Sequence, residues 1–141
     1  MSKIMWEPSD ANIKASQMMA FINFVNEKHN FSFTGYDDIY DWSINESEDF
    51  WGCFLEFSSI SYQGNFVKVV DDINKMPGAK WFSGIRLNFA ENLLKHRDEK
   101  IAIHFYGEDE KQTRISYSEL YVMVARLASS MRKMGIQKND R

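Results

Sequence analysis

The side chains with chemical potential in this chain are a single cysteine, three histidines and several adjacent acids. Cys53 lies between Gly52 and Phe54 on an aromatic-rich segment, and no base stands beside it in the sequence. A nucleophilic cysteine needs a nearby cation or a helix N-terminus to hold it as a thiolate. We therefore expect Cys53 to be a buried and inert thiol, with a nucleophile as the alternative.

Neither metal binding nor acid–base catalysis is favoured by the remaining polar residues. The histidines, at positions 29, 96 and 104, do not have the spacing of metal ligands, because none lies three to five residues from another histidine or cysteine. General acid–base catalysis needs a carboxyl whose pKa is raised by burial. The adjacent acids fall in expected turns or first helical turns, so we interpret them as solvated faces. They are Asp37-Asp38, Asp71-Asp72 and Glu108-Asp109-Glu110.

A phosphate-binding loop is also missing from the sequence. Such a loop needs clustered glycines, whose backbone N–H groups approach the anion, and the 7 glycines here are scattered. No G-x-S-x-G elbow of a serine hydrolase occurs. Lys80 and Arg86 flank the pair Trp81-Phe82 and offer a contact to a phosphate of a large ligand. Stacking on a ring, or pairing with Glu91, is the simpler interpretation. No catalytic, cofactor-binding or metal-binding residue is predicted.

The composition is that of one ordinary globular domain or slightly more. The 141 residues are 44% hydrophobic and 26% charged, and the 15% that are aromatic must find a buried place. A net charge of -3 argues against nucleic acid and anionic membranes as partners. One cysteine excludes an internal disulfide, Met1–Asp10 lacks the apolar stretch of a signal peptide, and no apolar run approaches the ~18 residues of a membrane helix. We expect a cytoplasmic protein.

Helical spacing dominates the first part of the chain. One helix is predicted from Ser9 or Asp10 to about His29, with an apolar stripe that packs on the rest of the chain or, alternatively, on a partner. The stripe is Met18, Phe21, Ile22 and Val25. A short helix is predicted over Tyr36–Trp42. Another should begin at a capping box of Asn45 and Glu48. It carries the bulky residues Phe50, Trp51, Phe54, Leu55 and Phe57.

The middle of the chain is less regular. Phe66–Val70 has the composition of a strand, and Met76-Pro77-Gly78 predicts a turn. The pair Trp81-Phe82 is expected to be buried beneath the next helix, which Asn88 caps. The inner edge of that helix should consist of Leu87, Ala90 and Leu94.

The last part of the chain predicts an antiparallel hairpin followed by a long helix. Ile101–Tyr106 alternates with the period of a strand, Gly107–Glu110 forms the turn, and Thr113–Tyr117 returns as the second strand. The capping box at Ser116 and the helical spacing up to Met134 predict the helix. The fold class is therefore α+β, a mostly helical N-terminal region followed by a hairpin and a long helix. The end of the chain, where a strand is about to begin, suggests a truncated polypeptide.

Seven short motifs follow one another along the chain. They are Trp6-Glu7-Pro8, Asp41-Trp42-Ser43-Ile44, Asp49-Phe50-Trp51, Met76-Pro77-Gly78-Ala79-Lys80-Trp81-Phe82, Leu87-Asn88-Phe89-Ala90-Glu91-Asn92-Leu93-Leu94, Arg114-Ile115-Ser116-Tyr117-Ser118-Glu119-Leu120 and Gly135-Ile136-Gln137-Lys138-Asn139-Asp140-Arg141. In this order they resemble the N-terminal region of acetoacetyl-CoA synthetases, also called acetoacetate–CoA ligases. These enzymes are relatives of acetyl-CoA synthetase in the acyl-adenylate-forming superfamily.

The resemblance implies a two-step reaction in the full-length enzyme. Acetoacetate and ATP give an acyl-adenylate and pyrophosphate, and coenzyme A then displaces AMP to give acetoacetyl-CoA. ATP, Mg²⁺ and coenzyme A are the implied cofactors. The family's phosphate loop, ribose grip and catalytic lysine have no counterpart in these residues and should lie beyond Arg141. The chain itself should then be structural and inactive, with no affinity for ATP or coenzyme A.

The resemblance also implies a division of the chain. Residues 1–97 resemble the helical N-terminal extension of acyl-CoA synthetases, and residues 98–141 resemble the truncated start of an α/β AMP-binding, or adenylating, domain. The apolar face of the last helix would then be uncovered, and the isolated chain would self-associate. Two alternatives stay open. The parent enzyme acts on acetate or propionate instead, or the chain is a non-enzymatic helical interaction module.

Overall fold

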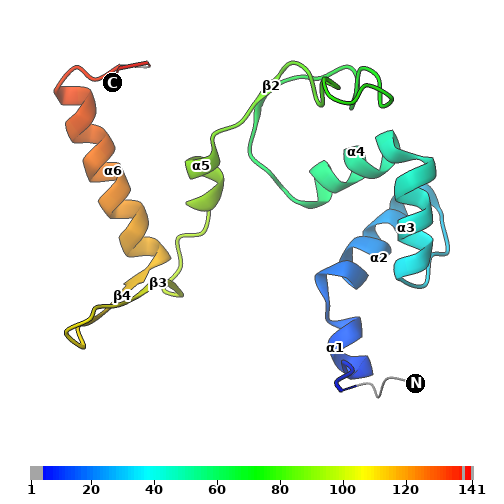
Figure 1. Ribbon diagram of the computed structural model, residues 1–141, viewed down its shortest axis with the longest axis horizontal. Coiled ribbons are helices and arrows are strands. Elements are labelled where there is room, and N and C mark those ends of the chain that lie inside the picture. The colour runs from blue at the N-terminus through cyan, green and yellow to red at the C-terminus, as the bar shows by residue number, and fades with distance from the viewer. Residues whose placement is uncertain (1–4, 138, 141) are drawn as a thin grey trace. The chain divides into compact units, whose positions relative to one another are not determined.

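The structure is a computed structural model that describes residues 5–137 and 139–140. Residues 1–4, 138 and 141 lie outside the described residues. They include the start of the Met1–Asp10 stretch that was considered for a signal peptide, and two positions of the Gly135–Arg141 motif. Contacts divide the chain after Arg86 into two compact units. The first contains α1 (Asp10–Lys14), α2 (Gln17–His29), α3 (Tyr36–Asn45), α4 (Ser47–Phe57), β1 (Gln63–Gly64) and β2 (Ile85–Arg86); the second contains α5 (Phe89–Leu93), β3 (Ile101–Tyr106), β4 (Gln112–Ser116) and α6 (Tyr117–Lys133) (Figure 1). The predicted α+β class is confirmed.

The core of the first unit lies where α2, α3 and α4 meet. Phe21 stands edge to face with Phe50 and Phe54 of α4, with ring centroids 5.8 and 5.6 Å apart, the geometry that ring quadrupoles favour. Removing a buried ring of this kind costs about 3–5 kcal/mol of folding free energy. The buried members of the core are Phe21, Ile22, Val25, Ile39, Trp42 and Cys53. The stripe predicted on the first helix therefore does pack on the chain itself, except at its first member, Met18, which is 42% exposed.

The first helix begins where predicted, because Ser9 caps α1 and its hydroxyl accepts the Asn12 N–H. Its continuity to His29 was wrong: the Ser16 hydroxyl accepts a hydrogen bond from the Met19 N–H and caps α2 separately. The predicted start of α4 was also wrong. Asn45 does not cap α4 but ends α3, where its side-chain amide donates to the Asp41 carbonyl. The helix predicted over Tyr36–Trp42 is confirmed and is one turn longer than expected.

The aromatic face of α4 is only partly buried. Cys53 is the buried residue of this helix, whereas Trp51 and Phe54 remain 41% and 39% exposed. The sequence predicted a wide buried stripe, but α2 and α3 cover only one side of the helix. The uncovered rings contact one another and the loop that follows.

The segment between α4 and α5 departs most from its prediction. Phe66–Val70 does not form a strand. The ladder lies instead between β1 and β2, with Gln63 paired to Arg86, and a single bridge joins Val70 to Trp81. The burial predicted for Trp81 was wrong: this residue is 41% exposed and stands edge to face with Trp51 of α4, 6.0 Å away.

The helix that was predicted to follow Trp81 is short and exposed. Asn88 caps α5 as predicted, with its side-chain oxygen accepting the Glu91 N–H at 3.2 Å. The helix spans 5 residues and buries none of them, and Leu87 is 56% exposed. The predicted inner edge of this helix was therefore wrong.

The hairpin and the last helix of the second unit are confirmed. β3 and β4 are antiparallel, with Phe105 opposite Thr113. The capping box closes on both sides, since the Ser116 hydroxyl accepts from the Glu119 N–H and the Glu119 carboxylate accepts from the Ser116 N–H. At the other end, Gly135 has a φ of 81°, and the Ile136 N–H reaches back to the Met131 carbonyl.

The loop before β3 packs on α6. The Arg97 guanidinium lies 3.9 Å from the centre of the Tyr121 ring, and the His96 ring lies against Tyr117. These contacts cross the predicted boundary between residues 97 and 98, and the compact units divide after Arg86 instead. The assignment of 1–97 to an extension and 98–141 to the start of an adenylating domain stays a prediction.

The second unit leaves most of its apolar surface in water. Among its described residues only Ser116 is buried. On α6, Met123 is 54% and Leu127 57% exposed, and on β3 Phe105 is 53% exposed. No helix of the described residues is long and apolar enough to cross a membrane.

The close approach of the chain beside the antiparallel pair β1–β2 predicts an effect at Gly84. Its φ is 106°, and a Cβ there would collide with the Asn65 carbonyl oxygen. We expect Gly84→Ala to lower the free energy of unfolding by about 1–3 kcal/mol, measured by urea titration with tryptophan fluorescence. The control is Gly52→Ala within α4, whose Cβ would make an ordinary 3.4 Å contact with Val69. Equal urea midpoints for the two variants would contradict this account.

The uncovered face of α6 predicts self-association of the isolated chain. Light scattering at high micromolar concentration should give a mass above that of the monomer, because apolar surface of this kind associates in water. Leu127→Lys should reduce the mass, whereas Trp6→Lys, an exposed residue of the first unit, should not. A monomer mass for the unchanged chain would argue against the prediction.

Candidate functional site

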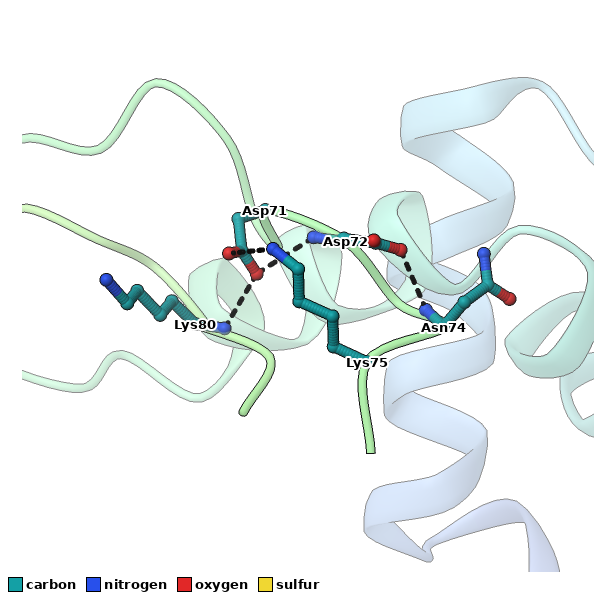
Figure 2. Close-up of polar contacts among 5 residues, drawn as sticks. All are labelled: Asp71, Asp72, Asn74, Lys75 and Lys80. Atoms are coloured by element: carbon teal, nitrogen blue, oxygen red, sulfur yellow. Dashed lines mark hydrogen bonds and ion pairs between the residues drawn. The ribbon is translucent and has the colours of Figure 1, made fainter. Parts of the chain in front are cut away.

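The carboxylate of Asp71 is the centre of a hydrogen-bonded loop in the first unit. It accepts hydrogen bonds from the Lys80 and Asp72 backbone N–H groups, each 2.8 Å away, and from the Lys75 Nζ at 2.9 Å (Figure 2). The Asp71 N–H in turn donates to the Lys80 carbonyl at 3.1 Å. One exposed carboxylate therefore closes the loop 71–80, next to the bridge between Val70 and Trp81.

These donors fix the charge state of Asp71. The Lys80 N–H, followed by Lys75, lowers the pKa of this carboxyl from 3.8 to about 2. A general acid or base needs the opposite change, a pKa raised toward neutrality. The predicted interpretation of Asp71-Asp72 as a solvated pair therefore fits the exposure of Asp71, but missed its role as an acceptor for the loop backbone.

Lys80 and Arg86, the two cations that flank Trp81-Phe82, make different contacts. Lys80 uses its backbone to hold the loop, and Figure 2 shows its side chain extending away from the Asp71 carboxylate. Arg86 lies in β2 opposite Gln63 and is exposed. Between them, Trp81 contacts Trp51 and the Phe82 ring contacts Phe66.

Cys53 has a partner that the sequence did not reveal. The His29 Nε2 lies 3.1 Å from the Cys53 Sγ, although 24 positions separate the two residues. Burial nevertheless raises the pKa of the thiol, so the neutral form is favoured over the nucleophilic thiolate. The pair is a hydrogen bond at the edge of the core, where His29 also packs on the Trp42 ring. The burial predicted for Cys53 is confirmed.

The other histidines stand apart from these groups. His96 contacts Tyr117, and His104 is stacked on Tyr106 along β3. Among the described residues, no three His, Cys, Asp or Glu side chains are grouped so that they could hold a metal ion. The prediction that this chain carries no catalytic, cofactor or metal residue is not tested by this geometry and stays a prediction.

The class of protein is indicated by a family model for the middle of the chain. Residues 36–93, from the start of α3 to the end of α5, match the family described as the N-terminus of acetyl-coenzyme A synthetase. Helices α3 and α4, the Asp71 loop and the Trp81 segment lie within the residues that match this family.

Longer comparisons point to a particular branch of that class. The chain is 37% identical to the acetoacetyl-CoA synthetase of Macaca fascicularis over 99% of its length, and 35% identical to that of Rhizobium meliloti over 97%. It spans about a fifth, 21%, of each relative. The solved acetoacetyl-CoA synthetase of Streptomyces lividans superposes with a TM-score of 0.83 at 29% identity, over 99% of this chain and 22% of that one. The predicted resemblance to acetoacetyl-CoA synthetases is confirmed.

The low pKa of Asp71 predicts a pH-dependent contribution to stability. Because its folded pKa of about 2 lies below the ordinary 3.8, the contribution is present above about pH 4 and is lost as the pH falls toward 2. Asp71→Asn should therefore lower the melting temperature at pH 7, and the gap to the unchanged chain should close at low pH. Asp37→Asn, an exposed acid in the first turn of α3, is the matched control. A gap that does not vary with pH would refute the assignment.

Proposed function

We propose that this chain is the N-terminal part of an ATP-dependent acetoacetate–CoA ligase. The observation that carries the proposal is the similarity to acetoacetyl-CoA synthetases over nearly the whole chain, together with the TM-score of 0.83 to one of them. The parent enzyme would act in the cytoplasm on acetoacetate, ATP and coenzyme A.

The proposed reaction has two steps. A carboxylate oxygen of acetoacetate attacks the α-phosphate of ATP, and pyrophosphate leaves. The thiol of coenzyme A then attacks the acyl carbon and expels AMP, which gives acetoacetyl-CoA. Charge on the phosphates would need Mg²⁺ and cationic side chains. The described residues offer no grouped ligands for a metal, so no step is assigned to them.

The proposed role of this chain is architectural. The lowered pKa of Asp71 makes its carboxylate a weak base, and the raised pKa of Cys53 favours the neutral thiol, so neither group is suited to proton transfer or nucleophilic attack. Hydroxyl groups such as those of Ser9, Ser16 and Ser116 cap helices. The use of these polar side chains in caps and turns supports a scaffolding role for the chain rather than a catalytic one.

A second candidate differs in the acid that is activated. A malonamoyl-CoA synthetase of Penicillium aethiopicum is 38% identical over 99% of this chain, as similar as the acetoacetyl-CoA synthetases. Malonamate has an amide where acetoacetate has a methyl ketone, and the acid would be selected by residues outside this chain. Acetate and propionate remain the further alternatives.

The proposal predicts a clear division of activity. The full-length polypeptide that contains this chain should form acetoacetyl-CoA from acetoacetate, ATP and coenzyme A, and more slowly from malonamate, acetate or propionate. The 141-residue chain alone should form no thioester, and calorimetry should detect no micromolar binding of ATP or coenzyme A. Thioester formed by the chain alone would overturn the architectural role. A full-length polypeptide without ligase activity on any of the four acids would favour an interaction module.

A further inference from the structure

We draw no further inference here: the strongest candidate, the surface patch on α3 where exposed Tyr36, Tyr40 and Ile44 adjoin the acids Asp37 and Asp41, is an apolar and acidic helix face, and nothing in the structure shows what covers it.

Discussion

Burial of aromatic and aliphatic side chains shapes both units of this chain, and the two units achieve it to different extents. In the first, the α2 stripe meets Trp42 and Cys53, and the rings of α4 close the core from one side. In the second, one sheet of two strands meets one helix, and no hydrophobic side chain among its described residues is fully buried. A hairpin covered on one face by a single helix has too little packing surface for a closed core.

This difference explains where polar groups are used. In the first unit, hydrogen bonds lock segments that the core leaves free: Asp71 closes the loop 71–80, and Asp38 accepts the N–H groups of Thr34 and Gly35 ahead of α3. Both carboxyls have lowered pKa values for that reason, as expected for acceptors of several N–H donors. Such groups stabilise loops and are poorly suited to proton transfer.

Structural features encoded within a few residues could be predicted from the sequence, and contacts between distant residues could not. The capping box at Ser116 and the alternation of Ile101–Tyr106 are encoded within a few residues, so the hairpin and α6 were predicted with nearly the observed bounds. The break at Ser16 was missed because the start of the helix was assigned to Ser9 or Asp10, which are residue types of the same capping kind. The His29–Cys53 contact and the Asp71–Lys80 bonds join distant positions, and nothing in the local pattern indicates them. Trp81 was misplaced because its burial was assigned to α5 on sequence proximity alone.

The second unit depends on Ser116 more than on its apolar contacts. This residue ends β4, caps α6 and is 4% exposed, and its hydroxyl also lies 3.0 Å from that of Ser118. The next two N–H groups, of Tyr117 and Ser118, donate to the carbonyls of Lys100 and Asp98, which ties the start of α6 to the entry into β3. The hairpin and the helix are thus joined by hydrogen bonds at one corner, while most of their apolar side chains remain exposed. A joint of this kind fixes the start of α6 against the hairpin through backbone hydrogen bonds, which do not require an apolar core around them.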